Sequence, residues 1–247
     1  MSESIVEIKG VSKTFKDFWL RPVAEAVRGV DIEVEKGDVF GLLGPNGSGK
    51  STTIKMLLGL LKPSSGEIRL FGLPPHDRRA RARLGYLPEL SYLHPFLTAR
   101  ETVLYYAGLS LMPRRAAKAR AAELLATVGL AGNEDRPVGG FSKGMARRVA
   151  FAAALVAQPE LLVLDEPTSG LDPIGTRDVK NLIRRLADGG MTVLITSHQL
   201  FDMQDICSRV AILSHGRVVG GGRISDIVSK ASDKRHALED YFAEVVA

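Results

Sequence analysis

Two patterns of apolar and polar residues divide the chain. Residues 5–10 and 30–34 alternate apolar and polar side chains, and this period of two predicts half-buried antiparallel strands. Residues 161–164, 191–196 and 210–213 are continuous apolar runs, which are typical of parallel strands buried on both faces. Helical patterns separate these runs. The sequence therefore predicts an α/β fold with a parallel sheet and an N-terminal antiparallel β-subdomain.

Shorter elements connect these two regions. A buried strand is predicted over residues 39–43, a helix over 52–61, and a short strand over 67–72 after a turn rich in serine, proline and glycine. The segment Lys16–Glu25 contains the single tryptophan and a proline, and we expect it to form a loop between the two N-terminal strands.

The middle of the chain has helical character. Thr98, followed three residues later by Glu101, forms a capping box that predicts the start of a helical stretch over residues 98–128. A second helix is predicted over residues 145–157, where it ends before a Gln-Pro pair. Both helices lie between elements of the predicted sheet, so we expect an inserted α-helical subdomain over about residues 90–158.

Composition narrows the class of protein. The 247 residues are 45% apolar and 25% charged, as in soluble globular proteins, and no apolar run is long enough to span a bilayer. No secretion signal is visible at the N-terminus. The lone cysteine, Cys207, excludes an internal disulfide framework, and we expect its thiol to be packed and unreactive. These features predict a cytoplasmic location.

The charge distribution gives a weaker indication. The net charge is +5, and two basic clusters at residues 76–83 and 114–120 contribute to it. Nucleic acid or anionic lipid could be attracted to either cluster. Neither cluster has interleaved aromatic residues on which bases could stack, so we favour solvated loops and helix faces and expect no direct contact with nucleic acid.

The most specific motif follows the strand at residues 39–43. Residues 44–51 match G-x-x-x-x-G-K-[ST], the phosphate-binding loop between a strand and a helix. Its glycines let backbone N–H groups turn inward around an anion, and the helix N-terminus adds partial positive charge. Lys50 is expected to reach the β- and γ-phosphates, and the Ser51 hydroxyl to bind Mg²⁺. The predicted ATP-binding residues here are Gly44, Pro45, Asn46, Gly47, Ser48, Gly49, Lys50, Ser51 and Thr52.

Two carboxylates follow the apolar run at residues 161–164. Ligands of open α/β sheets gather at the carboxyl ends of the strands, which makes Asp165 and Glu166 candidates for the same site. Asp165 is expected to hold Mg²⁺. Glu166 is expected to orient or deprotonate the water that attacks the γ-phosphate.

Four segments, taken together in this order, resemble the ATP-binding subunits of ABC transporters. The likeness extends from about Ile5 to Gly222. The resemblance implies an ABC ATPase domain over residues 1–225 and a short helical tail over residues 226–247. The segments are Phe141-Ser142-Lys143-Gly144-Met145, similar to the family's signature loop; Leu164-Asp165-Glu166-Pro167, similar to its acidic strand end; Ser169-Gly170-Leu171-Asp172, similar to its dimer-interface loop; and Thr196-Ser197-His198, similar to its switch segment.

The resemblance also implies roles for single residues. His198 is expected to contact the γ-phosphate, while Ser142 and Gly144 bind the γ-phosphate of ATP held by a second copy in a homodimer. Phe15 matches the aromatic residue that stacks on adenine; stacking by two nearby aromatic residues and core packing of Phe15 are alternatives. The two nearby residues are Phe18 and Trp19. The implied dimer-interface residues are Ser142, Lys143, Gly144, Met145, Ser169, Gly170, Leu171 and Asp172.

Three positions depart from the usual pattern of the family. Glu89 stands where the family usually has glutamine; its carboxylate can still bind Mg²⁺ but cannot donate a hydrogen bond to water. Lys143 and Met145 replace the usual glycine and glutamine of the signature loop. All three departures resemble the sub-group that exports drugs, antibiotics, ions and polysaccharides.

The resemblance thus implies an ATPase that drives a separate membrane permease, in the export direction, from the cytoplasmic face of the membrane. We expect the permease to dock near Glu89–Thr98, where residues 90–96 supply apolar and aromatic side chains. Internal packing of this loop is the alternative.

Two other functions are alternatives. The first is a soluble ABC ATPase acting on nucleic acid or ribosomes. The resemblance to that class would imply either two nucleotide-binding domains in one chain or one domain split by a long coiled coil. This sequence has neither feature. A P-loop kinase or GTPase is the second, and it would leave the signature loop unexplained.

Overall fold

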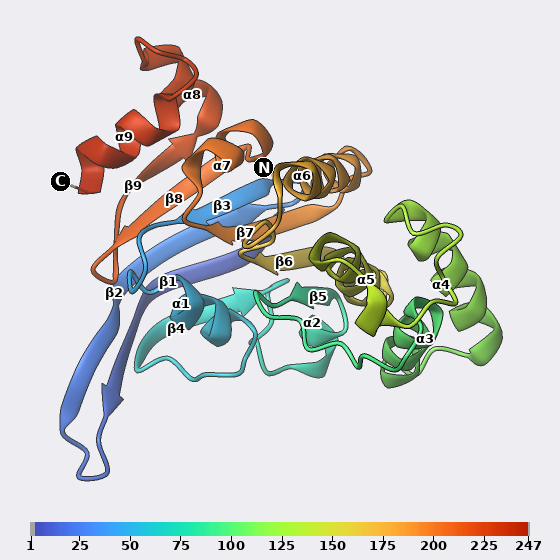
Figure 1. Cartoon of the computed structure of the whole chain (residues 1–247). Coiled ribbons are helices and arrows are strands. Elements are labelled where there is room, and N and C mark those ends of the chain that lie inside the picture. Colours follow the sequence, from blue (N-terminus) through green and yellow to red (C-terminus); the bar gives the residue numbers. More distant parts are fainter. Residues whose placement is uncertain (1–2, 247) are drawn as a thin grey trace. The chain divides into compact units, whose positions relative to one another are not determined.

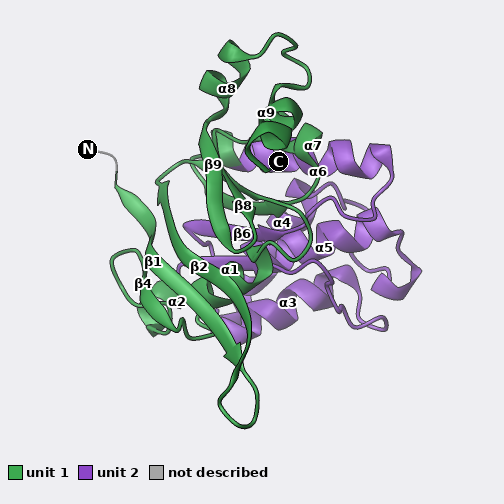
Figure 2. Cartoon of the chain, turned by 90° about the vertical axis from the view of Figure 1, so that its left-hand side faces the viewer, with its two compact units in different colours: residues 1–81, 187–247 green, residues 82–186 purple. Residues whose placement is uncertain are grey.

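The computed structural model describes residues 3–246. They form two compact units, coloured separately in Figure 2. The first unit contains the residues up to Arg81 and those from Ala187 onward, and the second contains residues 82–186. The sequence of the second unit is therefore inserted into that of the first.

The first unit contains a three-stranded antiparallel sheet in the order β2-β1-β4 (Figure 1). Val6 pairs with Val34 and Ile8 with Ile32, and all four side chains are buried. The period-two pattern thus places its apolar positions on one buried face, and the predicted antiparallel strands are confirmed. The strands are β1 (Ser4–Lys16), β2 (Pro22–Glu35) and β4 (Ser65–Leu70).

The hairpin of β1 and β2 is longer than the sequence pattern predicts. The loop predicted over Lys16–Glu25 is wrong, because strand pairing continues to Lys16 and Pro22 and residues 17–21 alone connect the strands. Asp17 closes this turn by accepting two hydrogen bonds of 2.9 Å from backbone N–H groups. The first four residues of β2 are all exposed, so they lack the alternation by which a half-buried strand is recognised.

The second sheet of this unit has the order β7-β3-β8-β9 (Figure 1). β3 lies between two parallel neighbours, and β9 pairs with β8 in the antiparallel direction. Every residue of β3 is buried, which explains its continuous apolar run. The predicted parallel strands are present, with one antiparallel strand at the edge. Their bounds are β3 (Val39–Leu43), β7 (Thr192–Ser197), β8 (Arg209–Ser214) and β9 (Arg217–Arg223).

The helices of the first unit include two near the end of the chain. Leu238 is fully buried, and its backbone N–H donates to the side chain of Gln204 at 2.9 Å. The Tyr241 hydroxyl accepts a hydrogen bond of 3.1 Å from the backbone of Gly221. Residues 237–246 are therefore packed against the rest of this unit. The helices are α1 (Lys50–Leu57), α2 (Arg78–Arg81), α7 (Leu200–Ile206), α8 (Ile224–Lys230) and α9 (Ala237–Val246).

The second unit combines a parallel pair of strands with helices. β5 (Leu84–Leu87) pairs with β6 (Leu161–Asp165), and α5 packs against β5. The helices α3, α4 and α5 pack against one another. The bounds are α3 (Ala99–Leu109), α4 (Arg114–Thr127), the 3₁₀ turn η1 (Val138–Gly140), α5 (Lys143–Leu155) and α6 (Pro173–Asp188), which ends at the border of the unit.

The helical stretch predicted over residues 98–128 is two helices. The predicted capping box at its start is confirmed, since Glu101 N–H donates to Thr98 Oγ1 at 3.1 Å and Thr98 N–H to the Glu101 carboxylate at 2.9 Å. The break precedes Pro113, because a proline disfavours the helical conformation of the preceding residue. Among the helices of residues 3–246, none combines the length and apolar character needed to cross a membrane.

Candidate functional site

The predicted phosphate-binding loop connects β3 to α1 in the first unit. Its strand–loop–helix context is as predicted, although the helix begins at Lys50, two residues earlier than the pattern indicates. The ammonium group of Lys50 is buried and donates to the carbonyl oxygens of Gly44, at 2.6 Å, and Pro45, at 3.1 Å. The lysine thus lies across its own loop. It can transfer these hydrogen bonds to phosphate oxygens that enter the loop.

Two glycines of this loop cannot be replaced without strain. Gly44 and Gly49 have φ angles of 152° and 108°, in the region that side chains disfavour. A Cβ at Gly44 would clash with the backbone carbonyl oxygen of Leu213, and one at Gly49 would lie 2.6 Å from the backbone carbonyl oxygen of Ala26. The close approach of neighbouring backbone therefore requires glycine at both positions.

The hydroxyl groups of the loop differ in exposure. Ser48 Oγ is buried and has no hydrogen-bond partner among the described residues, whereas Ser51 is exposed at the start of α1. The residues Pro45, Asn46 and Gly47 are exposed at the tip of the loop. An unsatisfied hydroxyl, a buried ammonium and a glycine-lined turn together form a cradle that fits an anion such as a triphosphate.

His198 leaves the same sheet beside this loop. Leu43, the last residue of β3, is the register partner of Ser197, the last residue of β7. Because the strands are parallel, the next residues, Gly44 and His198, leave the sheet at the same edge. The His198 side chain is exposed. The sequence-predicted switch histidine and phosphate-binding loop are thus brought together within the first unit.

The three aromatic candidates for adenine stacking differ in position. Phe15 is 40% exposed on β1, so it is not a core residue, and Lys13 Nζ lies 5.5 Å from the centre of its ring. It pairs with Ala24 of β2, and two residues further along β2 is Ala26, whose carbonyl oxygen would lie 2.6 Å from a Cβ at Gly49. The other two aromatic residues lie in the hairpin turn, where they pack edge to face at 5.4 Å; they are Phe18, 90% exposed, and Trp19, 72% exposed.

The acidic residues of the second unit also meet at one sheet edge. Leu87 of β5 is the register partner of Leu164 of β6, so Glu89 and the Asp165-Glu166 pair follow neighbouring parallel strands. Glu166 is 8% exposed and has a φ angle of 45°. A left-handed backbone at a residue other than glycine costs about 1–3 kcal/mol and persists where surrounding contacts determine it.

One arginine of α5 supplies those contacts. The buried guanidinium of Arg147 donates to the carbonyl oxygens of Pro88 at 2.6 Å and Glu89 at 2.9 Å. It also donates to the carbonyl oxygens of Asp165 at 3.0 Å, Glu166 at 3.1 Å and Pro167 at 3.1 Å. Its desolvation is the main cause that lowers the pKa of Arg147, to about 10, and nearby Asp165 and Glu89 oppose this shift. The guanidinium therefore stays charged at neutral pH.

The predicted signature loop lies at the N-terminus of α5. Ser142 caps the helix by accepting a 3.2 Å hydrogen bond from Met145 N–H, and both Ser142 and Lys143 are exposed. At Gly144 a Cβ would lie 4.0 Å from its nearest neighbours, so this surface is open. The exposed helix end offers N–H groups to an anion that approaches from outside the chain.

The loop after β6 ends in a second exposed turn. Asp172 accepts a 2.6 Å hydrogen bond from Gly175 N–H and so fixes the start of α6. Ser169 and Gly170 are exposed, and Leu171 is half-buried. Within residues 3–246, the His, Cys, Asp and Glu side chains do not gather in groups of three or more that could hold a metal ion.

Comparison with known proteins assigns the family. Residues 27–169, more than half of the chain, match the family model of the ABC transporter. The chain belongs to the ABC transporter family.

Several relatives within this family have descriptive names. An uncharacterized ABC transporter ATP-binding protein of Synechocystis sp. is 39% identical over 91% of this chain and 64% of its own length. The linearmycin resistance ATP-binding protein LnrL of Bacillus subtilis is 38% identical over 83% of this chain and 66% of its own length. The Nod factor export ATP-binding protein I of Burkholderia orbicola is 40% identical over 90% and 72%, respectively. This chain thus spans about two thirds of the length of these ABC proteins.

Solved structures of ABC cassettes share the fold. CbiO1 of Clostridium perfringens, part of the ABC transporter complex cbiONQ, has a TM-score of 0.81 at 28% identity and covers 92% of both chains. A dimeric ATP-binding cassette in a post-hydrolysis state, bound to ADP and phosphate, has a TM-score of 0.78 at 27% identity and covers 89% of this chain and 98% of its own. The predicted family, its α/β P-loop ATPase fold and the prediction of an ATP-binding protein are confirmed.

Sequence reasoning missed one residue of this ABC cassette. Arg147 lies outside every motif, and its guanidinium reaches residues up to 59 positions away. One signal could have revealed it: Arg147 lies three and four residues before Ala150 and Phe151, on the face of the helix that is buried. A charged residue on an otherwise apolar helix face requires polar partners, and here the backbone of two loops provides them.

Proposed function

We propose that this chain is the ATP-hydrolysing subunit of an ABC exporter. Two copies would close around two Mg·ATP molecules, and hydrolysis would drive a separate membrane permease. The observation that carries the proposal is the phosphate cradle of Gly44–Ser51, with the buried Lys50 ammonium poised over it. The export-related names of two relatives support the direction of transport.

Nucleotide binding would rest on the first unit. The loop N–H groups and Lys50 would hold the β- and γ-phosphates, and His198 would contact the γ-phosphate from the same sheet edge. Phe15 is the favoured partner for adenine. Its partner on β2, Ala24, lies two residues from Ala26, whose carbonyl oxygen is close to Gly49 of the phosphate-binding loop. Two residues along a strand correspond to about 7 Å, so Phe15 is closer to the loop along the strand than the turn residues are.

Hydrolysis would require the acidic residues of the second unit. Asp165 and Glu89, together with Ser51, would hold Mg²⁺, a cation that prefers oxygen ligands and is usually bound together with substrate phosphates. When bound, Mg²⁺ neutralises charge that develops on the phosphate oxygens. Glu166 would accept a proton from the attacking water, a role that contributes about 10²- to 10⁴-fold to the rate.

Dimerisation would complete each site. The exposed helix end at Ser142 and Gly144 would bind the γ-phosphate of ATP held by the partner copy, and the exposed loop at residues 169–172 would lie at the interface. The dimeric solved cassette supports this arrangement. ATP would then act as a ligand that stabilises the dimer, and its hydrolysis would release the two copies.

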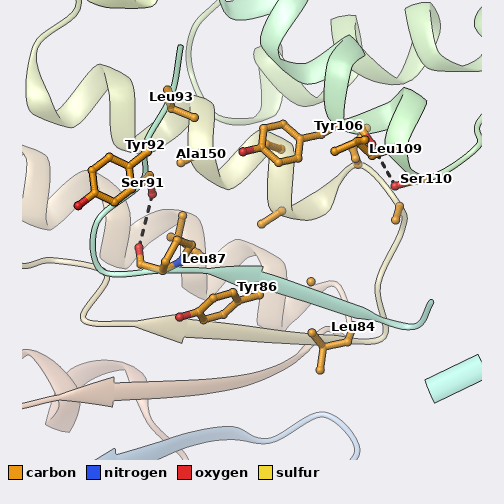
Figure 3. A pocket seen from close by; sticks show the side chains of 16 residues that line it. Leu84, Tyr86, Leu87, Ser91, Tyr92, Leu93, Tyr106, Leu109, Ser110 and Ala150 are labelled. Atoms are coloured by element: carbon orange, nitrogen blue, oxygen red, sulfur yellow. Dashed lines mark hydrogen bonds between the residues drawn. The ribbon is translucent and has the colours of Figure 1, made fainter. Parts of the chain in front are cut away.

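A pocket in the second unit supports permease docking. It has a volume of about 260 Å³ and is lined by Tyr86, Tyr92 and Tyr106 as well as small residues of α5 (Figure 3). Tyr92 is 89% exposed and Phe96 is 83% exposed, which disfavours internal packing of this loop. An apolar helix of a permease, docked near Glu89–Thr98, would cover these aromatic side chains.

The location follows from this partner. A subunit that docks on a permease would be peripheral on the cytoplasmic face of the membrane. We regard residues 1–225 as the ATPase domain, with an inserted helical subdomain at about residues 90–158, and residues 226–247 as a short tail. The names of the relatives favour transport over an action on nucleic acid or ribosomes.

The proposal is tested with the Glu166→Gln variant. It should bind Mg·ATP with unchanged affinity, lose at least about 10²-fold of the hydrolysis rate, and run as a dimer in gel filtration. The Ser142→Ala/Gly144→Ala double variant should hydrolyse poorly and remain a monomer. A Glu166→Gln protein that stays monomeric with saturating Mg·ATP would contradict the dimer model. Full-speed hydrolysis by the double variant would contradict the role of the signature loop.

A further inference from the structure

Arg147 contacts every segment of the second unit in which we place a group that acts on ATP. It belongs to α5, five residues after the helix cap Ser142. Its Nη1 donates to the backbone after β5, at Pro88 and Glu89. Its Nη2 and Nε donate to the backbone at the end of β6 and just after it, at residues 165–167. A single side chain therefore joins three segments that are far apart in the sequence.

We propose that Arg147 is a positioning residue that fixes the Glu166 carboxylate and the Glu89 loop relative to the signature helix. This inference rests on the proposed function, because it concerns the control of the same ATP site. Displacement of α5, by a second copy at Ser142 or by a permease at the adjoining pocket, would change the backbone of Glu166 through the guanidinium. Arg147 would thus link occupancy of the signature loop to the orientation of the general base.

The geometry at Glu166 explains why an arginine is required. The φ angle of 45° holds the backbone of Glu166 in a left-handed conformation, and its carbonyl accepts a 3.1 Å hydrogen bond from Arg147 Nη2. The neighbouring carbonyls of Asp165 and Pro167 bind the same guanidinium. Three consecutive carbonyls on one planar donor group define the path of the chain and therefore the direction of the Glu166 side chain.

The same donor group defines the Glu89 loop. Arg147 Nη1 donates to the carbonyls of Pro88 and Glu89, and it lies 3.3 Å from Ser91 Oγ. A lysine carries three donors on one compact ammonium, which cannot reach both loops at once as the fork of an arginine does. The substitution Arg147→Lys therefore keeps the charge and the aliphatic stem but removes the link between the two loops.

The matched control is Arg120→Lys. Arg120 also donates to the backbone of α5, at the carbonyl of Leu155, with a distance of 3.1 Å. It also pairs with Glu123 on its own helix. It contacts neither the Glu89 loop nor the acidic strand end in the hydrogen bonds described. The control thus repeats the same chemical change on α4, a helix that packs against α5, away from the proposed site.

The experiment measures ATP affinity, KM and kcat of the wild type, Arg147→Lys and Arg120→Lys. Misplacement of a reacting group by about 1 Å costs roughly 10²-fold in rate, so Arg147→Lys should lower kcat by about that factor. Its KM and its ATP affinity should stay within about twofold of wild type, because the phosphate loop is untouched. Arg120→Lys should hydrolyse ATP like the wild type.

A second measurement separates positioning from general loosening of the fold. In single-turnover hydrolysis with enzyme in excess, adding Arg147→Lys to Glu166→Gln should cause less than about a twofold further loss, since the residue to be positioned is already absent. Multiplicative losses would overturn the proposal. So would unchanged kcat in Arg147→Lys, or loss of its ATP binding, which would make the arginine a determinant of the fold instead. Inactivity of the wild type itself would refute the proposed function and not this inference.

Discussion

The candidate site residues of the first unit and those of the second unit are held in different ways. In the first unit, the Lys50 ammonium binds carbonyls five and six residues away, within its own loop. In the second unit, the Arg147 guanidinium binds carbonyls 18 to 59 residues away, in two other loops. The phosphate loop is thus a local structure, whereas the acidic strand end depends on a distant helix.

This difference determines what each group of residues can do. A local loop keeps its shape when its surroundings move, which suits tight binding of a substrate that always has the same phosphates. Loops tied to a distant helix follow that helix, which suits a catalytic group that must act when the partner is in place. Binding and hydrolysis are therefore expected to respond differently to mutation.

The largest expected effect concerns Lys50. Lys50→Ala removes charge-assisted hydrogen bonds to two phosphates, each of which contributes about 1.5–3 kcal/mol. ATP affinity in a fluorescence titration should fall by about 10²- to 10⁴-fold. Lys55→Ala, in the exposed part of the same helix, is the control and should leave affinity unchanged. If Lys50→Ala bound ATP as tightly as Lys55→Ala, the proposed role of Lys50 in ATP binding would be contradicted.

The next effect concerns the glycines of the phosphate-binding loop. Gly49→Ala should lower the free energy of unfolding by about 2–4 kcal/mol, since the Cβ would lie 2.6 Å from the Ala26 carbonyl at a φ angle of 108°. Gly47→Ala is the matched variant, because φ is 80° but no atom lies within 4 Å. It should lose only about 1 kcal/mol. Urea unfolding measures both, and equal losses would show that close approach of the backbone does not matter.

A smaller effect concerns Phe15, the aromatic residue of the first unit that we propose as the partner of adenine. Stacking of a base on an aromatic ring contributes about 1–3 kcal/mol, so Phe15→Ala should weaken ATP binding by about 5- to 150-fold. Trp19→Ala, in the hairpin turn, should have no effect on ATP affinity. The reverse result in calorimetric titrations would assign adenine to the turn and not to β1.

The smallest effect concerns Cys207, which packs beside β3. Burial raises the pKa of its thiol to about 12. The folded state thus favours the neutral thiol, and this contribution to stability is present below the pKa of an unfolded cysteine, about 8.5, and is lost as the pH rises toward about 12. Iodoacetamide at about pH 8.5 should label the urea-unfolded protein and leave the native protein unlabelled. Rapid native labelling would indicate an open core beneath the loop.

Local patterns allowed much of the first unit to be predicted. The buried run of β3, the glycine spacing and the helix after it depend on neighbouring residues, so the phosphate loop was identified with its correct context. The capping box at Thr98 was predicted for the same reason. The loop expected over Lys16–Glu25 was wrong because a strand exposed on both faces has no pattern to recognise.

The long-range links could not be predicted in this way. No motif marks Arg147, and no spacing relates it to Glu89 or Glu166; the register of β5 with β6 and the packing of α5 on β5 bring these residues together. The sequence alone determined the predicted phosphate-binding loop, since its geometry is set by residues that are close together along the backbone. Only the tertiary structure decided how the backbone that carries Glu89, Asp165 and Glu166 is held. The hydrogen bonds that hold it join segments that are distant in the chain and form only when the elements have packed.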